Sequence, residues 1–416
     1  QITMDDDGRE GGAAAFVPEE FACLLVEKFG ESGVTSRIVE DYKTCDLPGD
    51  GMTVRVSHAG LTVQDAMVVQ GRSGAVREYP AIPGTDLAGT VLRVDEAAER
   101  SGFRVGDRIV ATGGEMGQSR SGGYSQIARV PAELAWRLPK AMSNLRAAQL
   151  GTAAMTAALA CMEIERGDLA KSVSSSLPFR RGAGGGDDEH DVGERNDGSG
   201  GGGSEQKSDA TLHRLDRTNT LKRNKKMSRK GFVLVSGASG SVGSFATCLL
   251  VARGYRVVGV TRHLDKQNRL ARFGARKSVI LEDYVAQCAE DGALGEELYV
   301  GIVDVLGDGF LDMALPRLTR GGVCVSVGSM RGPTTCISLA PFIRRGVRLV
   351  GVDSRYISPA LRAVVWERLA RDIPPALFLE ERASFATCTL EQIQPLSGRK
   401  LSSGAAPVSC VVILPG

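Results

Sequence analysis

A glycine-rich turn between two apolar segments is the part of the chain with the clearest chemical meaning. It reads Gly237-Ala238-Ser239-Gly240-Ser241-Val242-Gly243 and joins the apolar residues 232–235 to 245–250. Glycines let backbone N–H groups approach a diphosphate closely, and the following helix N-terminus adds partial positive charge. We expect a dinucleotide here rather than an ordinary strand-to-helix turn. The residues predicted to hold its diphosphate are Gly237, Ser239, Gly240, Ser241, Val242 and Gly243.

Thr261 and Arg262 follow the next apolar segment, residues 255–260. An NAD site usually has an acidic residue about 20 positions beyond the glycines, where it accepts a hydrogen bond from the ribose 2′-hydroxyl. A hydroxyl and a guanidinium suit a 2′-phosphate instead, because arginine makes charge-assisted hydrogen bonds to phosphate oxygens. Lys266 and Arg269 follow and add positive potential. We therefore predict NADPH rather than NADH, the alternative being that Arg262 only begins a solvated helix face.

The glycine turn belongs to a longer alternation of strands and helices. Its spacing is typical of a doubly wound parallel sheet. Ligands collect at the carboxyl ends of such strands, so Leu306 and Gly328 are predicted to line the nicotinamide side, although both also suit a plain turn. The predicted strands are 232–236, 255–260, 278–281, 300–305, 322–327 and 347–352, and the helices lie near 243–253, 264–273 and 310–318.

Shorter apolar segments occupy the first part of the chain and indicate a mostly β module. An apolar helix is predicted from Ala147 to about Glu165, and another helix near 358–371. The apolar tail 408–414 is predicted to return as a strand to the first module. The predicted strands of this module are 22–26, 52–57, 87–94 and 108–111.

Residues 1–20 and 169–230 lack such patterns. The first segment is polar and acidic, and the second is rich in Ser, Gly and charged side chains. Neither buries enough apolar surface to offset its ordering entropy, so we expect a disordered N-terminus and a disordered insertion. The basic half of the insertion, residues 213–230, either keeps a tether extended or contacts an acidic partner, RNA or a membrane surface.

The composition limits the class of protein. A chain of 416 residues usually forms two domains, and 42% hydrophobic with 24% charged residues is typical of a globular protein. The net charge of +2 gives no general attraction to nucleic acid or membranes, and no apolar run reaches the length of a membrane span. No secretory leader is evident, and the nine cysteines form no Cys-x-x-Cys pair. We expect a reducing compartment, the cytoplasm or the mitochondrial matrix.

Several motifs in a fixed order resemble one enzyme superfamily. They are Pro83-Gly84-Thr85-Asp86-Leu87-Ala88-Gly89-Thr90-Val91, Gly151-Thr152-Ala153-Ala154-Met155-Thr156-Ala157, residues 236–246, Phe273-Gly274-Ala275, residues 304–308, Pro341-Phe342-Ile343 and Gly351-Val352-Asp353-Ser354. Over residues 21–165 and 231–400 the chain resembles the medium-chain dehydrogenase/reductase superfamily, in its zinc-independent quinone oxidoreductase branch. The group it resembles most is that of the acrylyl-CoA reductase-like proteins.

The resemblance implies an α/β fold with two modules. A GroES-like β-rich catalytic module is expected from residues 21–147 and 356–416. A Rossmann nucleotide-binding module is expected from residues 148–355, interrupted by the insertion at about 169–230. A homodimer formed through residues 347–352 is also implied.

The resemblance has consequences for the chemistry. Zinc members of the superfamily carry a His-Glu pair where this chain has Thr85-Asp86, and they use an early cysteine, so no metal site is expected. Hydride transfer without a Lewis acid favours reduction of a conjugated C=C bond in an enoyl thioester such as acryloyl-CoA, a quinone or an enone. Hydrogen-bond donors would then hold the charge that develops on the carbonyl oxygen.

Several expected contacts depend on matching or altered family motifs. The family's Asn-Tyr-Lys-Asp-Ala reads Thr62-Val63-Gln64-Asp65-Ala66, and Val63 cannot donate a hydrogen bond. Thr62 and Asp65 are the candidates at the hydride site, with a structural cap as the alternative for Asp65. Thr152 is expected at the cofactor or as an N-terminal cap of its helix. Arg399, in Gly398-Arg399-Lys400-Leu401, is expected to contact the cofactor phosphate.

Two classes of function remain open. The first is a working NADPH-dependent reductase of a small-molecule substrate. The second is a catalytically weak or inactive family member that serves as a structural subunit of a larger assembly. The altered segment 62–64, the insertion and the extended tail favour the second class, whereas the intact glycine turn and Thr261-Arg262 favour the first. An RNA-binding protein, resting only on residues 213–230, is a weaker third possibility.

Overall fold

The computed structural model describes most of the chain outside the insertion. It describes residues 16–30, 33–47, 49–72, 76, 78–176, 230–380, 385–402 and 409–414. For residues 169–176, 379–380 and 399–402 only the backbone is described. The disorder expected for residues 1–15 and 177–229 therefore concerns segments outside the described residues.

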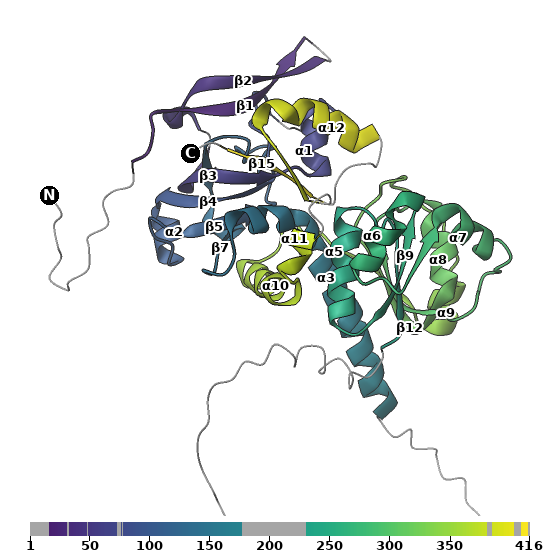
Figure 1. Cartoon of the computed structure of the whole chain (residues 1–416). Helices are drawn as coiled ribbons and strands as arrows, with labels where there is room; N and C mark the ends of the chain where they lie inside the picture. The colour runs from purple at the N-terminus through teal and green to yellow at the C-terminus, as the bar shows by residue number, and fades with distance from the viewer. Residues whose placement is uncertain are drawn as a thin grey trace, which may run out of the picture.

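The second half of the described chain forms a parallel sheet of the order β10-β9-β8-β11-β12-β13. The chain moves outward from β8 first in one direction and then, from β11, in the other, which creates a crevice where the strands end. Helices pack along this sheet (Figure 1). The strands are β8 (Phe232–Val235), β9 (Arg256–Thr261), β10 (Lys277–Ile280), β11 (Tyr299–Asp304), β12 (Leu318–Ser326) and β13 (Arg348–Gly351). The helices are α5 (Ser241–Ala252), α6 (Gln267–Arg272), α7 (Leu281–Cys288), α8 (Gly309–Ala314) and α9 (Ala340–Arg345).

The first half forms a second sheet together with the C-terminal end of the chain. Its order is β14-β15-β3-β4-β5-β7, with β6 paired to β3. The tail strand β15 pairs antiparallel with β3, which confirms the predicted return, and Figure 1 shows the yellow C-terminal elements beside the purple N-terminal ones. The strands are β3 (Met52–Gly60), β4 (Asp86–Arg93), β5 (Arg108–Thr112), β6 (Ile127–Val130), β7 (Ala135–Arg137), β14 (Phe385–Cys388) and β15 (Ser409–Ile413).

A two-stranded hairpin and several helices complete the β-rich module. The hairpin pairs β1 (Glu20–Phe29) with β2 (Gly33–Lys43), a strand that the sequence analysis missed. The helices are α1 (Val63–Val69), α2 (Glu96–Arg100), α10 (Pro359–Asp372), α11 (Ala376–Glu380) and α12 (Ile393–Ser402). The α10 helix is held to the module by the Trp366 ring, stacked on Trp136 at 5.7 Å, and by Arg362, whose Nη1 donates to Thr112 O at 2.8 Å.

The helix α3 (Asn144–Ser176) joins the two sheets. It bends at Gly151, whose φ of 49° lies in the left-handed region that glycine adopts readily. One hydrophobic cluster continues from Ala88 and Val110 through α3 to Phe245 and Val233, so the two modules share a core. The helix also runs to Ser176, which corrects the prediction that the insertion begins at residue 169.

Among the described residues, the helix α3 has the length of a membrane span, which the sequence pattern did not indicate. By length and composition, its residues Asn144–Asp168 are apolar enough to cross a membrane, although 78% of the most apolar window is buried inside the protein. The core helix of a soluble protein meets the same criteria, so the helix is only weak evidence for a span.

Candidate active site

Two adjoining cavities lie where the parallel sheet meets the β-rich module. The smaller has a volume of about 320 Å³ and surrounds the glycine turn, and the larger has a volume of about 930 Å³ and extends to α1, β4 and α3. Residues at their junction line both cavities. They are Val63, Ser241, Val242, Val327 and Gly328.

The glycine turn owes its shape to close packing between β8 and α5. Gly237 has a φ of 55°, and a Cβ on Gly243 would lie 2.4 Å from the Gly237 carbonyl oxygen. Gly243 is therefore required by backbone contact. A Cβ on Gly240 would meet only that same oxygen, at 3.3 Å, and Gly240 is exposed at the cavity. The helix α5 begins directly after Gly240, so its first N–H groups, which have no partners within the helix, lie beside the cavity.

The end of β9 carries positive charge into the smaller cavity. Arg262 and His263 line it, and Arg262 is exposed. Burial, followed by repulsion from Lys266 and Arg262, holds the pKa of His263 below its usual value. Burial and repulsion from Arg269 lower the pKa of Lys266 in the same way. No acidic side chain lines this cavity among the described residues, so the potential there favours an anion.

Thr261 lines the same cavity, but its hydroxyl bonds within the protein. Its Oγ1 lies 2.8 Å from Ser239 Oγ and accepts a hydrogen bond from the His263 N–H at 3.1 Å, and the residue is 2% exposed. This arrangement ties the end of β9 to the glycine turn. Of the pair predicted to bind the 2′-phosphate, Arg262 is thus the one whose polar group is exposed.

A buried hydrogen-bond network shapes the loops after β11 and β12. Ser236 Oγ donates to Asp304 Oδ1 at 2.8 Å, and Asp304 accepts the N–H groups of Leu306 at 3.1 Å and Gly307 at 3.0 Å. Burial raises the pKa of Asp304, partly offset by these bonds. A Cβ on Gly328 would lie 2.8 Å from Val305 O, so glycine is needed where these loops meet.

Of the two roles considered for Asp65, the hydride site and a structural cap, its contacts match the cap. Its Oδ2 accepts from the N–H and hydroxyl of Thr62 at 2.8 and 2.6 Å, and its Oδ1 accepts from the N–H and hydroxyl of Thr85 at 2.8 and 2.7 Å. Asp65 is 1% exposed and does not line the larger cavity. The structure therefore favours the structural cap of α1. Thr62 lines the cavity, with its hydroxyl hydrogen directed to Asp65.

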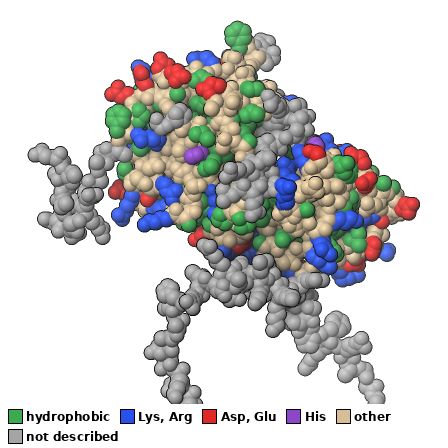
Figure 2. Space-filling view, viewed as in Figure 1, with side chains coloured by type: hydrophobic (Ala, Val, Ile, Leu, Met, Phe, Trp, Pro, Cys, Tyr) green, Lys and Arg blue, Asp and Glu red, His purple; other side chains and the backbone are tan. Residues whose placement is uncertain are grey.

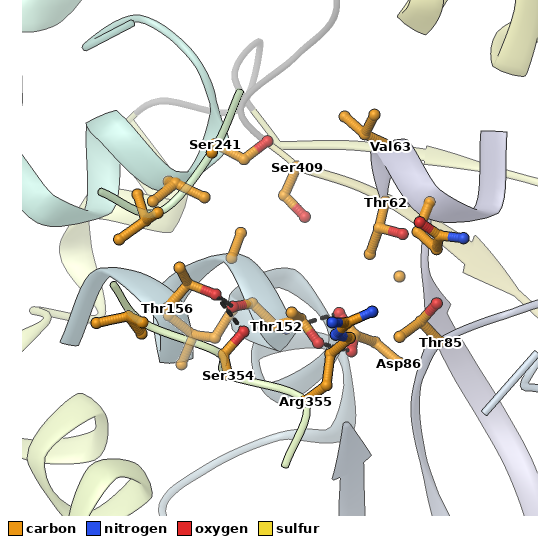
Figure 3. A pocket seen from close by; sticks show the side chains of 18 of the residues that line it. Thr62, Val63, Thr85, Asp86, Thr152, Thr156, Ser241, Ser354, Arg355 and Ser409 are labelled. Carbon is orange, nitrogen blue, oxygen red and sulfur yellow. Dashed lines mark hydrogen bonds between the residues drawn. The ribbon is translucent and has the colours of Figure 1, made fainter. Parts of the chain in front are cut away.

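Hydroxyl groups line much of the larger cavity. Figure 3 shows Thr152, Thr156, Ser241, Ser354 and Ser409 around it. The buried hydroxyls of Thr156 and Ser354 lie 2.7 Å apart, which joins α3 to the loop after β13.

The carboxyl of Asp86 also lines the larger cavity, and the sequence analysis did not name it as a functional residue. The Thr152 N–H donates to Asp86 Oδ2 at 2.7 Å, and Thr152 Oγ1 lies 2.5 Å from Asp86 Oδ1. Burial raises the pKa of Asp86 to about 7, against the opposing effect of these bonds. The sequence did contain one indication of a role for Asp86, because zinc members of the superfamily carry the Glu of their His-Glu pair at this position.

The structure brings most of the predicted residues together. The smaller cavity is lined by Gly237, Ser239, Gly240, Ser241, Val242, Thr261, Arg262, Leu306 and Gly328, and the larger by Thr62 and Thr152. Gly243 and Asp65 line neither cavity. Gly243 packs against the Gly237 carbonyl, and Asp65 accepts hydrogen bonds from Thr62 and Thr85. Arg399 lies on α12, and its side chain is outside the described residues.

A β-rich module joined to a parallel sheet of this strand order, with a cavity between them at the glycine turn, defines a two-domain dehydrogenase architecture. Residues 48–140 match the family described as alcohol dehydrogenase GroES-like domain, and residues 241–371 match the family described as zinc-binding dehydrogenase. The chain is 30% identical over 354 residues to the acrylyl-CoA reductase AcuI of Ruegeria pomeroyi, covering 85% of this chain and 88% of that protein.

Solved structures agree with this assignment. The yhdH oxidoreductase of Salmonella enterica in complex with NADP has a TM-score of 0.74 at 25% identity, over 95% of this chain and all of that chain. Bacillus subtilis protein yhfP with NAD bound has a TM-score of 0.72 at 29% identity, over 95% of this chain and 99% of that chain. The chain belongs to the medium-chain dehydrogenase/reductase superfamily, in its zinc-independent branch, among the oxidoreductases of the acrylyl-CoA reductase and quinone oxidoreductase group.

Replacing Asp65 distinguishes a structural cap from a catalytic group. Asp65→Asn substitutes an NH₂ for one accepting oxygen, so buried donors of Thr62 or Thr85 lose their partner. We expect a loss of about 3 kcal/mol in the free energy of unfolding, measured by chemical denaturation of the full chain. The matched control is Asp95→Asn. Asp95 is the half-buried N-cap of α2 and accepts one hydrogen bond, from the Ala98 N–H, and asparagine can accept the same bond, so stability should change little. Unchanged stability for Asp65→Asn would contradict the structural assignment.

Proposed function

We propose that the protein is an NADPH-dependent, zinc-independent reductase of a conjugated carbonyl compound, such as an enoyl thioester, a quinone or an enone. The observation that carries the proposal is the continuity of the two cavities. The anion-favouring cavity at the glycine turn opens directly into the larger, hydroxyl-lined cavity at the junction residues named above. A volume of about 930 Å³ lies in the range of small-molecule sites.

NADPH fits the residues at the end of β9. Of three similar solved structures at 25% identity or more, two contain NADP or NADPH and one contains NAD, so the preference is argued from this chain's own residues. Arg262 is exposed at the cavity, and no acidic side chain lines the cavity among the described residues. Burial is the main cause of the lowered pKa values of His263 and Lys266, and repulsion from neighbouring basic groups adds to it. A 2′-phosphate compensates the positive charge of Arg262, whereas a 2′-hydroxyl does not.

The donor set of the larger cavity suits a conjugated carbonyl substrate. Among the residues that the structure describes, no His or Cys lines this cavity, and no group of three or more His, Cys, Asp and Glu is placed to hold a metal ion. The donors that line it are hydroxyls, amides and the guanidinium of Arg355, which is paired with Asp353. Reduction of a conjugated C=C bond needs this kind of donor, because the charge moves to the carbonyl oxygen.

The chain's own residues position the reacting carbonyl. When bound, a reduced nicotinamide supplies a hydride. Gly237, Gly240 and the α5 N-terminus would bind the diphosphate. Ser354 is buried at the cavity wall, 2.7 Å from Thr156 Oγ1. The single hydrogen of Thr156 goes either to the Thr152 carbonyl oxygen, at 2.8 Å, or to Ser354 Oγ, and in the second arrangement the Ser354 hydrogen is available for the substrate's carbonyl oxygen.

Turnover by the purified full chain tests the proposal. We expect oxidation of NADPH, followed by its absorbance, in the presence of acryloyl-CoA, a small enone or a small quinone. The matched control is the same reaction with saturated propionyl-CoA, which offers no C=C bond. Binding of NADPH without turnover of any of the three substrates would favour the alternative, a weakly active or inactive member that serves as a subunit of a larger assembly.

Arg262→Ala tests the cofactor preference. We expect the Kd for NADPH to rise about 10- to 100-fold, the equivalent of one lost charge-assisted interaction, while the Kd for NADH changes little. Fluorescence titration of both nucleotides measures the two values. Arg276→Ala, an exposed residue that lines neither cavity, is the control and should leave both values unchanged. An equal loss of both nucleotides would contradict the 2′-phosphate contact.

We propose further that the protein forms a homodimer through β13. This strand ends the sheet order, so its outer edge has no strand partner among the described residues. Leu349 on this strand is 39% exposed, and the preceding segment of the chain carries two more exposed apolar side chains, Leu339 at 66% and Ile343 at 79%. An unpaired apolar edge of this kind favours pairing with a second copy about a two-fold axis.

Light scattering during size-exclusion chromatography measures the oligomeric state. We expect a dimer for the wild type and a monomer for Leu349→Arg, because the added charge would be buried at the edge. Val285→Arg, at a similarly exposed position on α7, should remain dimeric. A monomeric wild type would refute the dimer.

The other partner predicted from the sequence was an acidic molecule or RNA at residues 213–230. That segment lies outside the described residues, apart from Lys230. On the face shown in Figure 2, basic and acidic side chains are interspersed over both modules. The described surface in this view adds no support to nucleic-acid binding.

A further inference from the structure

The larger cavity contains a hydroxyl directly joined to a buried acid. Thr152 Oγ1 lies 2.5 Å from Asp86 Oδ1, and both residues line the cavity, with Thr152 half-buried and Asp86 2% exposed (Figure 3). Asp86 is fixed because its Oδ2 also accepts the Thr152 N–H at 2.7 Å. Gly151 keeps this approach open, since a Cβ there would lie 2.3 Å from Asp86 Oδ2.

We infer that Thr152 donates the proton that completes reduction of the substrate, and that Asp86 resupplies it through their shared hydrogen bond. The inference rests on the proposed function. It concerns the proton that must follow the hydride, which Val63, at the position of the family's tyrosine, cannot donate. Thr152 is the residue that touches the substrate, and Asp86 acts through Thr152.

The protonation state of Asp86 decides which way the Thr152 hydroxyl donates. When Asp86 is ionised, the only hydrogen of the hydroxyl is drawn into the bond with Oδ1. When Asp86 is protonated, the carboxyl donates to Thr152 Oγ1, and the hydroxyl hydrogen is released toward the cavity. A pKa of about 7 allows this change near neutral pH, where a proton donor works best.

The charged surroundings of Asp86 are consistent with this role. Asp65, beyond Thr85, raises the pKa of Asp86, and the buried guanidinium of Arg362 lowers it, while burial remains the largest effect. Tyr124 is buried, and its own pKa is raised well above its usual value, so it stays neutral. The remaining charged pair at this cavity, Asp353 with Arg355, is joined by hydrogen bonds at 3.1 Å.

The substrate gains one hydride and one proton in two linked transfers. Hydride adds to the β-carbon of the conjugated substrate, the C=C π bond breaks, and its electron pair moves to the α-carbon and carbonyl oxygen. The α-carbon then takes the Thr152 hydroxyl proton, forming a C–H bond. Thr152 Oγ1 takes the proton of Asp86, which is left as a carboxylate and is reprotonated from water. The net change is addition of one hydride and one proton to the C=C bond.

Two measurements on the full chain test the inference, and the first needs no cofactor. The infrared band of the protonated Asp86 carboxyl, isolated as the difference between wild type and Asp86→Asn, should titrate near pH 7. Thr152→Val removes a bond that favours the carboxylate, so the titration should move to higher pH. Thr152→Ser keeps the hydroxyl and should restore the wild-type value. A carboxyl that titrates at its ordinary acidic value would overturn the inference.

The second measurement is kcat with NADPH and acryloyl-CoA as a function of pH. Because the acid form donates, wild-type kcat should fall as the pH rises through the Asp86 pKa. Thr152→Val should lower kcat about 100-fold or more, Asp86→Asn should lower it and remove this pH dependence, and Thr152→Ser should retain most activity. Thr387→Val, an exposed residue of β14, is the control and should match the wild type.

The outcomes separate the inference from the proposed function. An active wild type with an equally active Thr152→Val, showing the same pH profile, would overturn the proton route alone. A wild type that reduces no conjugated substrate would overturn the proposed function and the proton route with it.

Discussion

The approach of α5 to the end of β8 is the constraint on which the rest of the site depends. Gly243 lies so close to the Gly237 carbonyl that no side chain fits between them, and this contact places the helix N-terminus beside the strand end. The Ser236–Asp304 bond then fixes the neighbouring loop at the same level. The nucleotide half of the cleft is thus formed mainly by backbone packing, and side chains such as Arg262 are added at its rim.

Much of the parallel sheet could be predicted from the sequence, because its strands are continuous apolar runs separated by turns. The six predicted strands correspond to β8 to β13 with small shifts at their ends. The strand β2 was missed because most of its side chains are exposed or half-buried and polar, so residues 33–43 lack a clear apolar face. The compartment, cytoplasm or mitochondrial matrix, stays a prediction.

The sequence predicted where in the chain the residues of the candidate site lie better than it predicted what each side chain contacts. The glycine turn and Arg262 followed from local spacing, which survives folding. Thr261 lines the smaller cavity and Asp65 caps α1, but their bonds to Ser239 and Thr85 join segments that are far apart in the chain, and no local pattern predicts them. The pKa of Asp86 depends on burial and on the charge of Arg362, a residue from a distant part of the chain. No local pattern encodes such an environment.

The long connection between α3 and β8 begins and ends at one side of the parallel sheet. The helix α3 ends at Ser176. The described chain continues at Lys230, two residues before Phe232, which is the amino-terminal end of β8. The glycine turn follows the opposite end of that strand, and in Figure 1 α3 runs away from the β-rich module before it ends. Both ends of this connection therefore lie away from the glycine turn, so the two cavities place no constraint on the points where the connection leaves and rejoins the described chain.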